Sequence, residues 1–379
     1  MHDAAIVGVG NTDFGRLYRE ADDERDAYSL AADAFAEALS DSGLDKSQVD
    51  GLICSRVSSY TRMGDMLGIR YPKIIHGLPA AGRFSGLALQ MAVMAIQTGQ
   101  ASVVACVYGN DGRSQGAKYG GGTDPNDVAA YDQSFGMTSP GAYVSMMYRN
   151  YQHRYGAPED ALAPVAISNR QWAQLNPHAV MQKSLTTEDY LRSKFIAEPM
   201  RLYDYCLIND GGVAFIVARA DIARDLPKPP AYVSAMATSG SLTNFYTSPD
   251  YFGEACRSVA DRLQNDSGMS PQDVDCFQIY DNFTPVVLFS MEGFGMASPG
   301  EAWQLVRDGR TGPGGSTPVN TSGGHTSESY MQGWAMHVEA VRQIRGEAGP
   351  RQVPDCRSVQ YICASPIVSS HIFTSEPLS

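Results

Sequence analysis

The side chains best suited to nucleophilic or metal chemistry in this sequence lie in no recognised motif. Its seven cysteines stand at irregular spacings without a CxxC pair, so neither a disulfide framework nor a metal site is indicated. We expect them to be reduced thiols of a cytoplasmic protein, packed mostly as small hydrophobic residues. His153 and His178 lack the spacing of metal ligands. Gly8 and Gly10 are a weak phosphate-loop signal and more simply mark a tight exit from a strand.

Charge and hydropathy narrow the classes of partner. The net charge of −12 argues against nucleic acid or an anionic membrane as the main partner. An anionic substrate would need a local cluster of Arg or Lys against that background. No apolar run of about 18 residues is present, so we expect no membrane span. Residues 1–7 lack the basic and apolar segments of a signal peptide.

One block of sequence occurs twice and indicates how the chain is organised. Asp41-Ser42-Gly43-Leu44 is followed by Val49-Asp50, and Asp266-Ser267-Gly268-Met269 is followed by Val274-Asp275. Each block comes after a helical stretch and before an apolar, strand-like run. A helix, a glycine stop and a strand, repeated about two hundred residues apart, suggest a duplicated α/β unit. We expect the functional site where the two halves meet, at strand ends and loops.

The repeat divides the chain into two predicted domains. We expect an N-terminal half at 1–225 and a C-terminal half at 231–379, joined by a segment that contains proline. Residues from about 110–200 break the repeat and are predicted to form an insertion that acts as a lid and substrate-binding region. Residues 86–98 are apolar on nearly all sides, which predicts a helix buried in the middle of a domain.

The chain as a whole resembles the thiolase superfamily, nearest to the sterol-carrier-protein-type thiolases and their thiolase-like relatives. The resemblance covers essentially the whole chain and rests on segments that are specific only jointly. They are Ile6 to Gly15, Ser85-Gly86, Pro199 to Leu202, Asn209-Asp210-Gly211, Tyr280 to Phe283, and Gly323-Gly324 with Gly333. The resemblance implies an α/β protein with the thiolase fold, in which two similar mixed α/β halves form five αβαβα layers with the active site between them.

The sequence departs from the thiolase pattern at three catalytic positions and in the loop after a fourth. A thiolase has its nucleophilic Cys two residues before the Ser-Gly of the buried helix, where a helix N-terminus lowers the thiol pKa; this chain has Arg83. Tyr330 stands in place of the His of a Gly-His-Pro motif, and Tyr280 in place of the Asn of an Asn-Glu-Ala-Phe motif. Cys363 matches a second family cysteine, but without its glycine-rich loop. These departures imply that the fold is kept and thiolase chemistry is lost.

The altered pattern resembles the thiolase-like aldolases that cleave steroid side chains as CoA thioesters. This implies a retro-aldolase that splits the β-hydroxyacyl-CoA side chain of a steroid or bile acid into a ketone or aldehyde plus acetyl- or propionyl-CoA. The family uses tyrosine acid–base catalysis and no covalent cysteine intermediate. It also implies an OB-fold/zinc-ribbon partner subunit and a homodimer within a heterotetramer. Zinc is expected only in the partner, and no cofactor in this chain.

Family roles can be carried over to three tyrosines. Tyr280 is expected to be the base that takes the hydroxyl proton, and Tyr330 the acid that protonates the α-carbon and holds the thioester oxygen. Tyr246, or alternatively Tyr251, would complete the oxyanion site. A tyrosine can both donate and accept a proton, but its pKa near 10 lies well above neutrality. A basic tyrosine therefore needs a nearby cation, for which Arg83 is the candidate.

Four residues are expected to bind substrate or to support the tyrosines: Arg83, Asp281, His325 and Cys363. Simpler interpretations remain for three of them: an ion pair of Arg83 with a carboxylate such as Asp281, a loop position for His325, and a buried inert thiol for Cys363. Two alternative functions also remain. One is a thiolase-like acyltransferase that uses Cys363 or another thiol, and the other is a non-catalytic subunit that binds acyl-CoA or a partner enzyme.

Overall fold

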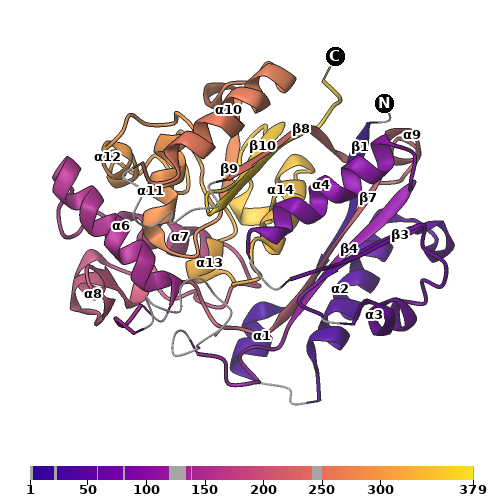
Figure 1. Cartoon of the computed structure of the whole chain (residues 1–379), viewed down its shortest axis with the longest axis horizontal. Coiled ribbons are helices and arrows are strands. Elements are labelled where there is room, and N and C mark those ends of the chain that lie inside the picture. The colour runs from indigo at the N-terminus through magenta and orange to yellow at the C-terminus, as the bar shows by residue number, and fades with distance from the viewer. Residues whose placement is uncertain are drawn as a thin grey trace.

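The computed structural model describes residues 3–20, 24–57, 59–79, 82–118, 134–137, 139–240 and 250–378. Nine strands form one sheet in the order β3-β2-β4-β7-β1-β8-β11-β10-β9 (Figure 1). Two further strands pair separately. In chain order the strands are β1 (Ala4–Asn11), β2 (Gly51–Ser55), β3 (Ile74–Leu78), β4 (Val103–Asn110), β5 (Phe195–Ala197), β6 (Met200–Arg201), β7 (Gly211–Arg219), β8 (Ala231–Gly240), β9 (Cys276–Ile279), β10 (Ser358–Cys363) and β11 (Ile367–Thr374).

The strand directions show the duplication that the sequence repeat predicts. In the first half β1 is antiparallel to β7, β7 antiparallel to β4, and β4 parallel to β2. In the second half β8 is antiparallel to β11, β11 antiparallel to β10, and β10 parallel to β9. The halves join where Ala5 pairs with Tyr232 and Ile6 with Ala231, between β1 and β8. The same arrangement therefore extends outward from both sides of one seam.

The repeated sequence block has the same structural task in both halves. Helices α2 (Ala27–Ser42) and α10 (Gly253–Ser267) each end at a glycine with φ near 70°, Gly43 and Gly268, a conformation that only glycine adopts without strain. The aspartate at the end of the block then accepts backbone N–H groups at the start of a neighbouring strand. Asp50 binds the amides of residues 102 and 103, and Asp275 binds those of residues 357 and 358.

Helices complete five layers. On the outer faces α2 packs on β1, β7 and β4, and α10 packs on β8 and β11. The middle layer holds α4 (Phe84–Gln97) and α14 (Trp334–Ile344), which contact strands of both halves. The predicted thiolase arrangement is confirmed, and the helix expected at residues 86–98 is the buried α4. No helix among the described residues is both long and apolar enough to cross a membrane.

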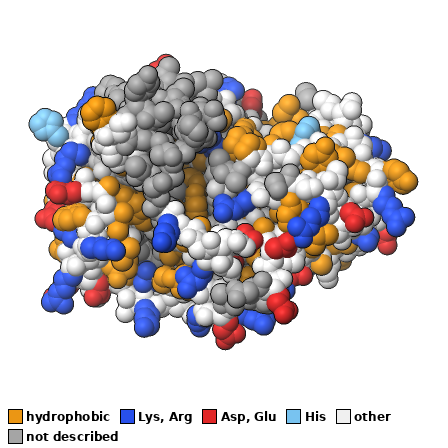
Figure 2. All heavy atoms as spheres, turned by 60° about the horizontal axis from the view of Figure 1, so that its bottom comes forward, with side chains coloured by type: hydrophobic (Ala, Val, Ile, Leu, Met, Phe, Trp, Pro, Cys, Tyr) orange, Lys and Arg blue, Asp and Glu red, His pale blue; other side chains and the backbone are white. Residues whose placement is uncertain are grey.

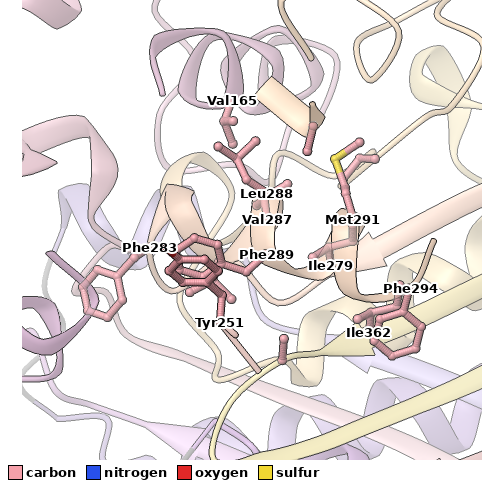
Figure 3. Close-up of a cluster of buried hydrophobic side chains, with 14 of the residues drawn as sticks. Val165, Tyr251, Ile279, Phe283, Val287, Leu288, Phe289, Met291, Phe294 and Ile362 are labelled. Atoms are coloured by element: carbon pink, nitrogen blue, oxygen red, sulfur yellow. The ribbon is translucent and has the colours of Figure 1, made fainter. Parts of the chain in front are cut away.

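The insertion between β4 and β7 covers the second half. It carries α6 (Pro140–Tyr155), α7 (Ala163–Gln174) and α8 (Thr187–Arg192). Helix α7 packs against α11 (Thr284–Gly293), α12 (Ala302–Arg307) and α13 (Gly324–Ser327), and its Val165 joins the apolar cluster of the second half (Figure 3). The other helices are α1 (Phe14–Arg19), α3 (Tyr60–Leu67) and α9 (Ala220–Ala223).

Candidate active site

The two tyrosines singled out from the sequence lie together. The hydroxyl oxygens of Tyr280 and Tyr330 are 3.0 Å apart, within hydrogen-bond distance. Tyr280 follows the last residue of β9, and Tyr330 lies in the loop between α13 and α14. Both belong to the second half of the chain, and the first half contributes the surface that they face.

Backbone contacts fix each tyrosine. The amide of Tyr280 donates to Ile362 O at 2.7 Å, which ties the strand end to β10. The amide of Tyr330 donates to the side-chain oxygen of Asn209 at 2.7 Å, so the Asn209 to Gly211 turn before β7 holds the second tyrosine from the first half. Asn209 has no predicted functional role, although it lies in one of the segments that carry the family resemblance.

The first half makes room for the phenol of Tyr280 at Gly82. A Cβ atom placed on Gly82 would lie 1.7 Å from the hydroxyl oxygen of Tyr280 and 2.2 Å from its Cζ. No side chain other than hydrogen fits there unless the phenol moves. Gly82 directly precedes Arg83, the residue before α4, so the phenol reaches the N-terminal end of the buried helix.

Both phenols are neutral in the free protein. Burial is the main cause that raises the pKa of Tyr280 and of Tyr330, and their mutual contact adds to the shift for Tyr280. Arg83 is half-buried, with its guanidinium 5.6 Å from the Phe84 ring. The surroundings raise the pKa of Tyr280 rather than lower it, and the role of Arg83 as the cation for a basic tyrosine stays a prediction.

Asp281 and His325 form a pair behind the tyrosines. Both are fully buried, and His325 Nδ1 lies 3.0 Å from Asp281 Oδ1. Asp281 also accepts the amide of His325 at 2.8 Å and Asn169 Nδ2 at 2.6 Å. The sequence had left open an ion pair of Arg83 with Asp281, but this carboxylate is bound by His325 and Asn169 instead.

Cys363 is a buried thiol at the end of β10, and its Sγ lies 3.8 Å from Ser365 Oγ. Burial raises its pKa to about 12, despite the charge of Arg83, so it is a weak nucleophile at neutral pH. All seven cysteines are free and buried. Within the described residues, no group of three His, Cys, Asp or Glu side chains could hold a metal ion.

The third tyrosine is not located. Tyr246 lies outside the described residues. Its alternative, Tyr251, donates to Asn150 Oδ1 at 2.7 Å and stacks on Phe289 in the apolar cluster of the second half (Figure 3). Tyr251 is therefore engaged in the core there.

A cavity of about 910 Å³ is lined in part by Cys206 and by Thr326, which follows His325 in the chain, whereas Tyr280 and Tyr330 are not among its lining residues. Residues 205–208 form one wall, and this wall is joined to the site because Cys206 N donates to Asn282 O and Leu207 N to His325 O. The rest of the lining combines basic and apolar side chains. It includes Arg113, Arg170, Lys183, Val180, Leu185, Ile196, Leu202 and Tyr203. The face at the bottom of Figure 1, turned forward in Figure 2, shows Lys and Arg side chains among hydrophobic ones.

Comparison with known proteins gives matches over nearly the whole chain. Two family models match: "Thiolase, N-terminal domain" at residues 4–221 and "Thiolase C-terminal domain-like" at residues 237–371. A steroid side-chain-cleaving aldolase of Thermomonospora curvata is 36% identical, with 90% of each chain covered. A 17-hydroxy-3-oxo-4-pregnene-20-carboxyl-CoA lyase of Mycobacterium tuberculosis is 35% identical, with 90% of this chain and 92% of that protein covered.

Solved structures agree with the fold. The structure described as Ltp2-ChsH2(DUF35) aldolase superposes with a TM-score of 0.88 at 33% identity, covering 98% of this chain and 97% of that one. Human mitochondrial 3-ketoacyl-CoA thiolase superposes with a TM-score of 0.72 at 15% identity, covering 98% of each chain. At that identity the second likeness concerns the fold alone.

Proposed function

The chain belongs to the thiolase family, and we propose that it is a lyase of that family which cleaves a carbon–carbon bond in the β-hydroxyacyl-CoA side chain of a steroid or bile acid. The products are a ketone or aldehyde and acetyl- or propionyl-CoA. The observation that carries the proposal is the 3.0 Å contact between the hydroxyls of Tyr280 and Tyr330, at a site where Arg83 stands in place of the thiolase nucleophile. The aldolase and lyase named among the relatives support it.

The neutral state of both phenols favours a proton relay. The substrate hydroxyl gives its proton to Tyr280 as the Cα–Cβ bond breaks. Tyr280 passes its own proton to Tyr330, and Tyr330 protonates the α-carbon of the enolate. The electron pair of the broken bond forms the thioester enolate, and the carbon that carried the hydroxyl becomes the carbonyl. Both phenols end neutral, so the path needs no phenolate and no covalent intermediate.

The cavity lined by residues 205–208 suits an acyl-CoA. Its volume of about 910 Å³ is at the upper end of ordinary ligand pockets. Arg113, Arg170 and Lys183 in its lining supply positive charge for phosphate groups in a chain of net charge −12. The apolar residues of the lining suit a hydrophobic acyl group. We propose that the pantetheine arm runs along residues 205–208, whose backbone is hydrogen-bonded to Asn282 and His325.

Cysteine chemistry is disfavoured by the same geometry. An acyltransferase would need a thiolate, but the pKa of Cys363 is raised to about 12 by burial. The residue before α4 that would carry a thiolase nucleophile is Arg83. A non-catalytic acyl-CoA-binding subunit would gain nothing from two buried hydroxyls at the positions of thiolase catalytic residues, because burying each phenol costs desolvation free energy.

We propose the partners on separate grounds. An OB-fold/zinc-ribbon subunit is suggested by the structure described as Ltp2-ChsH2(DUF35) aldolase, with zinc in that subunit and no cofactor in this chain. A homodimer within a heterotetramer is supported by β3, which is one of the two edge strands of the nine-stranded sheet. Large apolar side chains are exposed around this edge, namely Tyr60, Met66, Tyr71, Ile75 and Met94. An uncovered edge of this kind is suited to pairing with a second copy.

The test uses the chain co-expressed with its OB-fold partner and a series of steroid β-hydroxyacyl-CoA thioesters. Mass spectrometry should detect acetyl- or propionyl-CoA together with the shortened steroid. Tyr280→Phe and Tyr330→Phe should each lower kcat by about 10²–10⁴-fold while acyl-CoA binding is retained. Tyr251→Phe is the matched control, because its hydroxyl is bound to Asn150. Unchanged cleavage in both tyrosine variants would refute the proposal.

A further inference from the structure

The ring of His325 lies against both tyrosines. Its centroid is 4.8 Å from that of Tyr280 and 5.2 Å from that of Tyr330, and both contacts are edge-to-face. The side chain is 1% exposed. A residue that touches both members of a pair can set the distance between them, whereas a residue that touches only one cannot.

One hydrogen bond and one close contact orient the ring of His325. Its Nε2 accepts the backbone N–H of Gly333 at 3.0 Å, which requires a lone pair on that nitrogen. Its Nδ1 lies 3.0 Å from Asp281 Oδ1 without the geometry of a hydrogen bond. The ring is therefore held between the Gly333 amide and a carboxylate.

The bond to Gly333 is made to a loop whose backbone is unusual. After Tyr330, Gln332 has φ of 50° and Gly333 has φ of 87°. A side chain other than glycine in this region costs free energy and persists where its surroundings hold it. His325 holds this loop from outside, since it accepts the Gly333 amide just before α14 begins. The position of Tyr330, three residues earlier, depends on the same loop.

Asn169 completes the support from the insertion. Its Nδ2 donates to Asp281 Oδ2 at 2.6 Å and to Thr326 Oγ1 at 2.8 Å. The other oxygen of Asp281 accepts the amide of His325. The carboxylate therefore binds the backbone amide of His325 and lies against its ring, and α7 of the insertion is connected to the tyrosines through one carboxylate and one imidazole.

We infer that His325, oriented by Asp281 and Asn169, is a positioning residue that keeps the hydroxyls of Tyr280 and Tyr330 in contact. The inference deepens the proposed lyase function, and its catalytic consequence rests on that function. The predicted effect of His325 on the contact between the two hydroxyls does not rest on that function, because their distance can be measured without any substrate.

The first experiment is structural. Crystal structures of the complex with its partner should be compared for the wild type, His325→Phe and His325→Gln. Phe keeps an aromatic ring but loses the Gly333 hydrogen bond and the contact of Nδ1 with Asp281, so the two hydroxyls should separate beyond hydrogen-bond distance. Gln can place an acceptor near the former Nε2 and should keep the Gly333 bond and a shorter separation. An unchanged contact in His325→Phe overturns the inference, whatever the enzyme does.

The second experiment measures kinetics and stability together. His325→Phe should lower kcat by about 10²-fold, as a misplacement of about 1 Å does, with KM for the acyl-CoA little changed. His325→Gln should recover part of kcat. His371→Phe is the control, because His371 is equally buried and its ring stacks on Tyr361 instead. It should lose thermal stability but keep kcat. Equal losses of kcat in the His325→Phe and His371→Phe variants would mean a merely structural role and overturn the inference.

A charge swap keeps the test valid if His325→Phe does not fold. Asp281→Asn replaces one of the two acceptor oxygens by an NH₂ donor. The bonds from Asn169 Nδ2 and from the amide of His325 cannot then both be kept, and kcat should fall. The double variant Asp281→Asn/Asn169→Asp restores a donor and an acceptor and should recover kcat. Failure of the double variant to recover, when it is as stable as the wild type, overturns the inference. Absence of cleavage by the wild-type complex would instead refute the proposed function and leave the geometric test standing.

Discussion

Substitution of Gly82 by alanine is expected to lower kcat by displacing the phenol of Tyr280, although both tyrosines are retained. The added Cβ would lie 1.7 Å from the hydroxyl oxygen of Tyr280, whereas ordinary contact begins at 3.4 Å. The phenol must retreat by about as much as the added atom intrudes, and the 3.0 Å contact with Tyr330 is then lost. A displacement of this size costs about 10²-fold in kcat, and the forced repacking costs about 1–3 kcal/mol of stability.

The assay pairs steady-state kinetics with chemical unfolding, and Gly64→Ala is the control. Gly64 lies in α3, where a Cβ would meet its nearest atom at 3.5 Å, so this variant should keep kcat and hold or gain about 0.5–1 kcal/mol. Tyr280→Phe added to Gly82→Ala should cost little more, because the hydroxyl is already out of place. The reasoning is refuted if kcat of Gly82→Ala matches that of Gly64→Ala.

Four further outcomes follow from the buried groups. Burial lowers the pKa of His337 and brings that of His371 to about 3; the unfolded chain binds protons below about pH 6.5 that the folded chain does not, so stability should fall below that pH by about 1.4 kcal/mol per unit per histidine. Urea unfolding at about pH 7 and about pH 5 tests this, and equal values would contradict it. Burial raises the pKa of Glu328 to about 8. The contribution of Glu328 to the free energy of unfolding is therefore full below about pH 4.5 and is lost as the pH rises through 8. Glu328→Gln should therefore be less sensitive than the wild type to a rise in pH across that window, and parallel unfolding curves would contradict this. Intact mass spectrometry of the denatured enzyme after mixing with substrate should show the unmodified chain, whereas an acyl adduct on Cys363 would restore the acyltransferase alternative. Because burial raises the pKa of both Tyr280 and Tyr330, kcat should be flat through neutral pH, and a rising limb there would indicate a phenolate base.

The architecture could be predicted because its signals are local and occur twice. A glycine stop and an aspartate ahead of a strand are short-range features, and Asp50 and Asp275 show why both copies are present: each caps the neighbouring strand of its own half. The helix was readable because α4 packs on strands of both halves and is apolar along most of its length, even at the exposed Met94. Such features follow from hydrogen bonding and burial within one unit, so the sequence alone was sufficient to identify them.

The candidate site was only partly predictable, because its supports are contacts between distant segments. Tyr280 and Tyr330 were found through motif positions, but the need for Gly82 arises only when a strand end from the second half reaches it. Nothing in the residues near His325 indicates that its ring will accept the Gly333 amide while facing Asp281. For Arg83 the sequence allowed an ion pair with Asp281, but that carboxylate is bound by the amide of His325 and by Asn169.

The position of the tyrosine pair explains how one fold can support two chemistries. In a thiolase the start of the buried helix stabilises a thiolate. Here the phenol of Tyr280 reaches that helix end beside Gly82 from the other half of the chain. In the proposed mechanism the hydroxyl proton returns to carbon, so no net proton is released and the path uses only two neutral phenols in contact. The helix end then only has to provide space. For this reason an arginine can stand at the position of the nucleophile, with a glycine before it.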